Sequence, residues 1–367
     1  MITSLVSADD HVDIGHDKVK SFLDPKFHGH YDDALMRFAA SMGPLLSTDV
    51  NVKWREQHGL HGPSSNNLAS HASRELPSGH TDAVSRLQDM DRDGVAASAT
   101  YCEVSAFRYL YDIKEGWREA TRAFNSALLE FASPDPGRLI VSAQIPLHDI
   151  DVAVDEVRWA ASAGIKSLQL PVFPAELGLP DYWDDRYYPL WHAISDAGLP
   201  VCCHIGLNTQ LETVARRDPT PEKGIFVPMV ALSTAEALGQ VLLTGLFERF
   251  PELKFVFVEP GVGWVAWWLA GVDDMMSRQG YDFPGLKQLP SEYFRRQVFL
   301  TYIDEPYVLE HARNILGVEN LMWSSDYPHP VTSFPNSREI AERTVKDGTE
   351  PEQQLLLSGN ASRVWNL

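Results

Sequence analysis

Cysteine, basic charge and targeting signals are all scarce in this chain of 367 residues. Three cysteines occur, and Cys202 and Cys203 are adjacent, so the sequence implies no disulfide framework. The N-terminus has neither the basic segment nor the apolar run of a secretory signal, and we expect a soluble, cytoplasmic protein. The net charge of −19 argues against binding to nucleic acid or to an anionic membrane, because both require basic patches.

Long uninterrupted apolar runs are also missing. The nearest approach is LKFVFVEPGVGWVAWWLAGV, residues 253–272, which is interrupted by Glu259, Pro260 and several glycines. This pattern predicts a strand, a turn and a helix, and it argues against a membrane span.

Apolar material is abundant, with a hydrophobic fraction of 44% and ten tryptophans, and it is arranged in a strand–helix alternation. Helical spacing is clear in segments such as residues 119–132. The alternation predicts a parallel sheet buried on both faces, closed into a (β/α)8 TIM barrel as one domain over residues 1–367. A doubly wound open sheet is less favoured, because no GxGxxG motif follows the first strand. The predicted strands are Ile2–Ala8, Ala96–Tyr101, Leu139–Gln144, Ser167–Pro171, Pro200–His204, Lys254–Glu259, Val298–Tyr302 and Leu321–Asp326.

A long insertion, residues 12–90, interrupts the alternation after the first strand. It is rich in Gly, Ser, Asn and Pro, and a structureless loop of this length is unusual in a compact domain. We therefore expect short helices that form a lid or a subunit contact. The insertion contains His16, His28, His30, His58, His61, His71 and His80.

Residue types that bind metal recur at the predicted strand ends, where a barrel builds its active site. These ends carry Asp9, Asp10 and His11 on strand one, His204 on strand five, Glu259 on strand six and Asp326 on strand eight. Alternation along an extended chain places Asp9 and His11 on one face while Asp10 points away. Carboxylates with imidazoles suit Zn²⁺, Mn²⁺ or Fe²⁺ and disfavour a thiolate site.

Several longer motifs accompany these residues: RLQDMDRDGV (86–95), DPGRLIVSAQIPLHD (135–149), GIKSLQLP (164–171), DDRYYPLWHAISDAGLPVCCHIG (184–206), SSDYPHP (324–330) and GNASRVWNL (359–367). Together they resemble the amidohydrolase-2 branch of the amidohydrolase superfamily. That branch includes metal-dependent decarboxylases of aminocarboxymuconate semialdehyde and of hydroxybenzoates, together with hydrolases and hydratases. The resemblance also implies a homodimer.

The resemblance assigns roles to individual residues. Asp9 and His11 match the first-strand ligand pair, and His204 matches the fifth-strand ligand. Asp326 matches the aspartate that touches the metal and acts as general base on a metal-bound water. His329 would orient Asp326 or bind substrate.

The chain departs from the branch at two strands. The branch decarboxylases carry a histidine on strand six, where this sequence has Glu259. Strand four ends in Gln169 and Pro171, so it offers no lysine for the carbamate bridge of the binuclear hydrolases.

Four functions follow from this ligand set. We expect first a hydrolase with one divalent ion, zinc before iron or manganese, whose activated water attacks an amide, ester, lactone or activated C–C bond. In this mechanism Glu259 would be a catalytic residue that positions the water or a substrate hydroxyl. Alternatively, Asp9, Glu259 and Asp326 with two histidines hold two irons in a monooxygenase, which has precedent in the superfamily. A metal-dependent decarboxylase or hydratase of an aromatic or unsaturated acid, and a non-catalytic binding protein, are further alternatives.

The expected substrate is a hydrophobic or aromatic small molecule. Tyr101, Trp264 and Tyr302 lie at or just beyond predicted strand ends, where they would form the substrate-binding wall.

Overall fold

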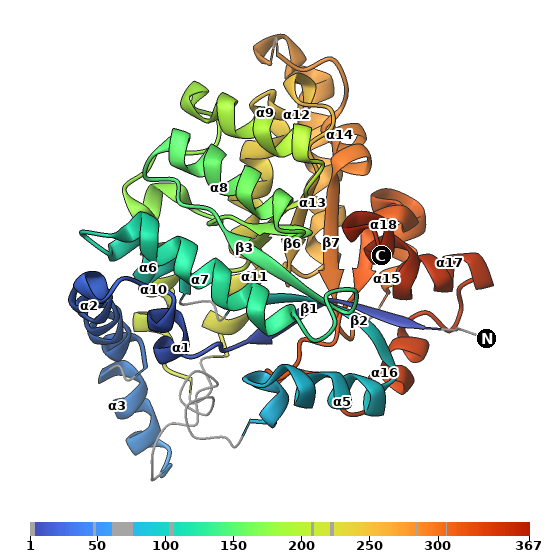
Figure 1. Ribbon diagram of the computed structural model, residues 1–367. Coiled ribbons are helices and arrows are strands. Elements are labelled where there is room, and N and C mark those ends of the chain that lie inside the picture. The colour runs from blue at the N-terminus through green and yellow to red at the C-terminus, as the bar shows by residue number, and fades with distance from the viewer. Residues whose placement is uncertain are drawn as a thin grey trace.

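The computed structural model describes residues 4–46, 49–60, 76–102, 106–206, 209–220, 224–283, 285–305 and 307–367. Eight parallel strands form one sheet in the order β1 to β8, with helices around it (Figure 1). This architecture confirms the predicted (β/α)8 barrel. The strands are β1 (Leu5–Val12), β2 (Val95–Cys102), β3 (Leu139–Gln144), β4 (Ser167–Gln169), β5 (Val201–His204), β6 (Phe255–Val258), β7 (Val298–Tyr302) and β8 (Leu321–Trp323).

Helices connect successive strands and cover the outside of the barrel (Figure 1). They are α1 (His16–Ser21), α2 (His28–Leu46), α3 (Asp49–Gln57), α5 (Ala83–Asp93), α6 (Ala106–Asp112), α7 (Trp117–Ala132), α8 (Ile150–Ser162), α9 (Tyr188–Ala197), α10 (Thr209–Arg217), α11 (Phe226–Leu243), α12 (Leu246–Arg249), α13 (Gly263–Gln279), α14 (Pro290–Gln297), α15 (Val308–His311), α16 (Ser337–Thr344), α17 (Glu350–Gln354) and α18 (Asn360–Trp365). Among the described helices, none combines the length and apolar character needed to cross a membrane.

Two apolar clusters follow from side-chain alternation along the strands. The larger one fills the layer between the barrel and its helices, and includes Leu300 and Trp323. The smaller one occupies the barrel interior, with Ala8, Cys202 and Val256 among its members, and Trp365 of α18 belongs to it. Because this apolar cluster fills much of the barrel interior, the polar residues of the site gather at the carboxyl ends of the strands.

Strand β1 differs from its predicted bounds. It runs from Leu5 to Val12 and therefore carries the acidic residues within the strand, whereas the prediction ended it at Ala8. Residues 2 and 3 of the predicted strand lie outside the described residues. The pairing with β2 shifts register between Ser7 and Asp10, and such a bulge re-aims the side chains that follow it.

The described part of the predicted insertion, residues 12–90, contains several helices. It forms α1, α2 and α3 and leads into α5, and α2 packs against α6 and α10, which follow β2 and β5. His61 and His71 lie outside the described residues. Residues 253–272 contain β6, a turn and the first part of α13, which confirms the strand–turn–helix prediction.

Candidate metal centre

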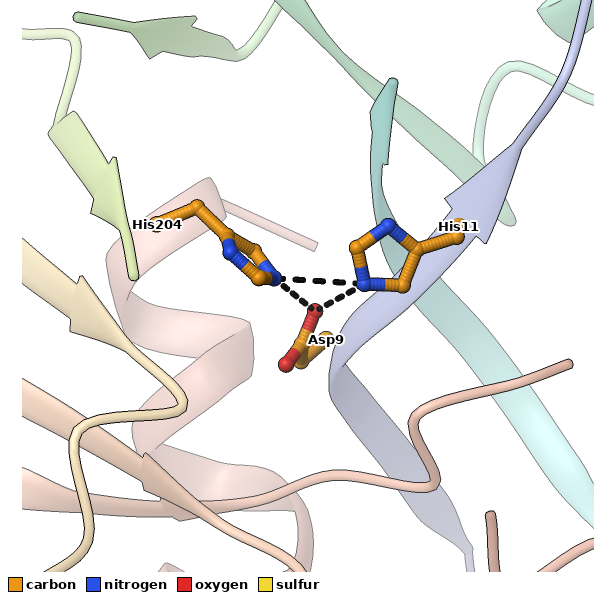
Figure 2. A group of neighbouring side chains, drawn as sticks. All are labelled: Asp9, His11 and His204. Atoms are coloured by element: carbon orange, nitrogen blue, oxygen red, sulfur yellow. Dashed lines mark hydrogen bonds and ion pairs between the residues drawn. The ribbon is translucent and has the colours of Figure 1, made fainter. Parts of the chain in front are cut away.

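Asp9, His11 and His204 converge at the carboxyl ends of β1 and β5 (Figure 2). The two imidazole Nε2 atoms lie 3.2 Å apart. Asp9 Oδ1 is 3.6 Å from His11 Nε2 and 3.5 Å from His204 Nε2. A tetrahedral ion with bonds of about 2.0–2.2 Å places its ligand atoms about 3.3–3.6 Å apart, so the triangle has the dimensions of a metal site.

The polar atoms of this triangle are otherwise poorly satisfied. Asp9 and His11 are fully buried, and within the described part of the chain neither carboxylate oxygen of Asp9 has a hydrogen-bond partner. Burial has removed this carboxylate from water, so it is stabilised by a positive charge placed between it and the two imidazoles. The residues therefore fit a divalent metal ion, which Asp9, His11 and His204 would hold.

Asp326 brings a second carboxylate to the same point from the loop after β8. Its Oδ1 lies 3.3 Å from His11 Nε2 and 2.8 Å from His329 Nδ1. The His329 ring stacks on His11 with centroids 3.7 Å apart. Burial alone would raise the pKa of Asp326, but His329 and His11 lower it to about 2. Asp326 is thus an ionised carboxylate beside His11 and His329, and it belongs to the group of residues that could hold a metal ion.

Glu259 completes the cluster from the turn after β6. One oxygen from each of Asp9, Glu259 and Asp326 lies within 4.8 Å of the others, and Glu259 Oε2 is 3.8 Å from His204 Nε2. Glu259 and Asp326 both adopt left-handed backbone conformations, with φ of 60° and 52°. Non-glycine residues adopt this region at an energetic cost, and such residues concentrate at functional sites.

Strand β7 and the loop after it hold the turn that carries Glu259. The Glu259 N–H donates to Thr301 Oγ1 at 2.8 Å, and the Val262 N–H donates to the Glu305 carboxylate at 2.8 Å. Burial and the nearby Asp326 raise the pKa of Glu259 to about 8 in the metal-free protein. No sequence pattern indicates the supporting roles of Thr301 and Glu305.

Hydrogen bonding leaves His204 ready to bind metal through Nε2. Its Nδ1–H donates to the Ile205 carbonyl at 3.0 Å, the kind of contact that fixes the tautomer of a metal ligand. Burial lowers the pKa of His204, but Asp9 and Glu259 outweigh this effect and raise it to about 9. For His11, burial and the neighbouring His329 lower the pKa. The metal-free centre therefore holds a protonated His204 beside a neutral His11.

The three predicted wall residues lie in different surroundings. Tyr101 is fully buried in the barrel interior and packs edge-on against His204, with centroids 5.7 Å apart. Trp264 lies in the first turn of α13, and its Nε1–H donates to the Pro260 carbonyl at 2.6 Å. Tyr302 belongs to the outer layer between barrel and helices. The structure thus brings Tyr101 to the ligand cluster and places Trp264 on the Glu259 turn, while Tyr302 faces away from both.

Asp10 points away from the ligand cluster, as the alternation predicted. It accepts hydrogen bonds from Ser7 Oγ at 3.0 Å and from Ser325 Oγ at 2.6 Å. Among the described residues, none of the insertion histidines joins a potential metal-ligand group. The predicted ligands Asp9, His11, His204, Glu259 and Asp326 are the ones that converge, together with His329.

The barrel and its ligand cluster define the class of metal-dependent (β/α)8-barrel enzymes. A family model described as amidohydrolase matches residues 28–367, and the chain therefore belongs to the amidohydrolase family.

Known proteins similar to this chain include several decarboxylases. The gamma-resorcylate decarboxylase of Rhizobium sp. (strain MTP-10005) is 23% identical over 300 residues, covering 74% of this chain and 85% of that protein. A crystal structure of an amidohydrolase from Mycobacterium avium subsp. paratuberculosis K-10 has a TM-score of 0.75 at 20% identity, covering 100% of both chains. The 5-carboxyvanillate decarboxylase of Novosphingobium aromaticivorans, solved with bound manganese and 3-methoxy-4-hydroxy-5-nitrobenzoic acid, has a TM-score of 0.71 at 14% identity, covering 99% of this chain and 97% of that chain.

Proposed function

We propose that this protein is a metal-dependent decarboxylase of an aromatic carboxylic acid. The observation that carries the proposal is the position of Asp326, whose Oδ1 lies beside a potential metal ligand and 2.8 Å from His329 Nδ1. The names of similar proteins favour decarboxylation over the hydrolysis that we expected from the sequence. Hydrolysis by a metal-activated water stays a prediction that the same experiments address.

The substrate carboxylate would be bound by the ion, because none of the described strands ends in a lysine or an arginine that could bind it instead. When bound, a divalent ion would neutralise the substrate carboxylate and polarise it. The similar decarboxylase was solved with bound manganese. We therefore propose manganese as the ion on equal terms with the zinc that we expected first.

Asp326 and His329 would supply the proton that replaces the carboxyl group. The C–C bond to the carboxyl carbon breaks, CO₂ leaves, and the ring carbon keeps the bonding pair and takes a proton. In our proposal this proton passes from His329 Nδ1 to Asp326 Oδ1 and then to the ring. The His329 side chain is 12% exposed, so it can recover a proton from solvent, whereas Asp326 is fully buried.

The test is release of CO₂ from protein loaded separately with Mn²⁺ and Zn²⁺. The acids offered are 2,6-dihydroxybenzoate, 5-carboxyvanillate and 2-amino-3-carboxymuconate-6-semialdehyde, and an ester and lactone panel is run in parallel. We expect CO₂ and the decarboxylated product from at least one of the two aromatic acids, with His204→Ala as the inactive control, whereas turnover of the acyclic semialdehyde alone would assign a decarboxylase of unsaturated acids instead. Hydrolysis of esters or lactones without CO₂ release from any acid would replace the proposal by the hydrolase.

A second candidate, a binuclear oxygenase, is favoured by one observation. Asp9, Glu259 and Asp326 place three carboxylates within 4.8 Å of one another, and carboxylate-rich sites suit iron or manganese. Two irons per chain with substrate-dependent O₂ consumption would support it. If Glu259→Gln retains a single ion and normal activity, Glu259 is not a ligand and this candidate fails.

We also propose that the insertion covers the mouth of the barrel as a lid or as a contact in a homodimer. The packing of α2 against α6 and α10 supports this placement, because these helices follow the carboxyl ends of β2 and β5. Removal of residues 28–57 would then raise KM more than it lowers kcat, and light scattering would report any change of mass.

A further inference from the structure

The first and last strands meet at a seam directly behind the ligand cluster. An isolated parallel bridge links Asp10 to Tyr327. The Asp326 N–H donates to the Asp9 carbonyl at 2.8 Å, and the His11 N–H donates to the Tyr327 carbonyl at 2.6 Å. The seam therefore sets the spacing between the ligands of β1 and the ligand that follows β8.

Asp10 is the centre of the seam. Besides Ser7 and Ser325, its carboxylate accepts a hydrogen bond from the Tyr327 N–H at 3.1 Å and another from Ser98 Oγ of β2. The side chain is 2% exposed, so these bonds form away from water. One carboxylate thus joins β1, β2 and the loop after β8.

Arg86 of α5 reaches the same seam from outside the barrel and is 1% exposed. Its Nε–H donates to the Gly79 carbonyl at 2.8 Å, and Nη2 donates to the carbonyl of the ligand His11. Nη1 lies 3.8 Å from Asp10 Oδ2. The guanidinium also lies over the Tyr327 ring, 4.2 Å from its centroid.

We propose that Arg86 is a positioning residue of the metal centre, which holds His11 and the Tyr327 segment in register. Its planar fork contacts the insertion, β1 and the β8 loop together, whereas a lysine would offer a single point of charge. Stability alone explains a buried ion pair poorly, because apolar residues of similar volume often stabilise a fold as well. The inference rests on the metal centre and is independent of the reaction catalysed there.

The test compares Arg86→Gln and Arg86→Lys with the control Arg138→Gln. Arg138 likewise donates to strand carbonyls, those of Ala96 and Val95, but at the start of β2. The dissociation constant for Co²⁺ is measured by chelator competition, and the visible spectrum of bound Co²⁺ reports ligand geometry. Loss of a hydrogen-bond partner of a ligating side chain weakens metal affinity by about 10–100-fold. Because Arg86 donates to the main-chain carbonyl of His11, a loss at the lower end of this range is expected for Arg86→Gln.

The Co²⁺ affinity of Arg86→Lys is expected to lie between those of Arg86→Gln and the wild type. Arg138→Gln is expected to match the wild type in Co²⁺ affinity and in the visible spectrum. An unchanged Co²⁺ affinity and spectrum in Arg86→Gln would overturn the role assigned to Arg86. Failure of the wild type itself to bind a divalent ion would instead count against the metal centre.

A second variant separates positioning from folding. Arg86→Gln leaves the buried Asp10 carboxylate without its counter-charge, and therefore lowers the thermal midpoint of the metal-free protein. The double variant Arg86→Gln, Asp10→Asn removes that charge and is expected to recover part of the thermal midpoint while Co²⁺ affinity stays low. Recovery of both the thermal midpoint and the Co²⁺ affinity in the double variant would show that Arg86 acts through stability alone, and would overturn the proposal.

Discussion

Acidification is predicted to expel the metal from this protein in a defined pH window. In the metal-free state the pKa of His204 is raised from 6.5 to about 9, whereas a metal-bound His204 must lack the Nε2 proton. Protonated His204 therefore stabilises the metal-free fold fully below pH 6.5, and this contribution is lost as the pH rises through 9. The affinity for the metal therefore increases as the pH rises through the same window.

The size of the effect follows from the shift. At pH 7 the ion must displace a proton from His204, whose pKa lies about two units above the pH. This displacement costs about 2.7 kcal/mol. Between pH 6.5 and 8.5 the affinity should rise about 100-fold through His204 alone. Glu259, with its pKa raised to about 8, contributes in the same direction because a cation favours its ionised form.

Titration with Mn²⁺, with free Mn²⁺ measured by electron paramagnetic resonance, gives the affinity at each pH. Replacement of the exposed His192 by Asn is the control and should leave the dependence unchanged. Glu259→Gln should reduce the number of protons displaced per ion by one at pH 7. An affinity that varies less than about threefold between pH 6.5 and 8.5 would refute the assignment of His204 as a ligand that loses a proton.

Three further predictions concern the ligands and the ion. His204→Ala removes one corner of the ligand triangle, so metal content and activity should both be lost while the far-ultraviolet circular dichroism stays that of the barrel. Asp326→Asn should keep the ion on Asp9, His11 and His204 but lower kcat by about 100-fold or more, and near-normal kcat would contradict its role in proton transfer. Chelation should lower the thermal midpoint of unfolding, because an ion at 1,000 times its Kd adds about 4.1 kcal/mol to the free energy of unfolding. The unfolding entropy of 367 residues is about 0.8 kcal/mol per kelvin, so calorimetry should show a decrease of about 5 °C.

The convergence of the ligands was predictable from the sequence because it depends on two regular rules. Residues two apart on a strand share a face, which pairs Asp9 with His11, and parallel strands of a barrel end on one side, which adds His204, Glu259 and Asp326. Neither rule needs knowledge of side-chain packing.

The exact run of β1 and the support of the ligands were not predictable in this way. The acidic stretch after Ala8 has the composition of a loop, yet it continues the strand, because Ser7, Ser98 and Ser325 satisfy Asp10 from three places in the chain. Arg86 contacts the His11 carbonyl across 75 positions, and no local pattern marks such a contact.

The seam between β1 and β8 has a consequence for biosynthesis. Asp10 accepts a hydrogen bond from the Tyr327 N–H, and the two residues are 317 positions apart, so the candidate metal centre joins two segments that are distant in the sequence. A ribosome must therefore synthesise all residues from Asp9 to Asp326 before the ligand set exists. Closing so long a loop is entropically unfavourable until the intervening strands are in place. Metal uptake should accordingly be among the last events in the maturation of this enzyme, and nascent chains that stop before Asp326 should not retain the ion.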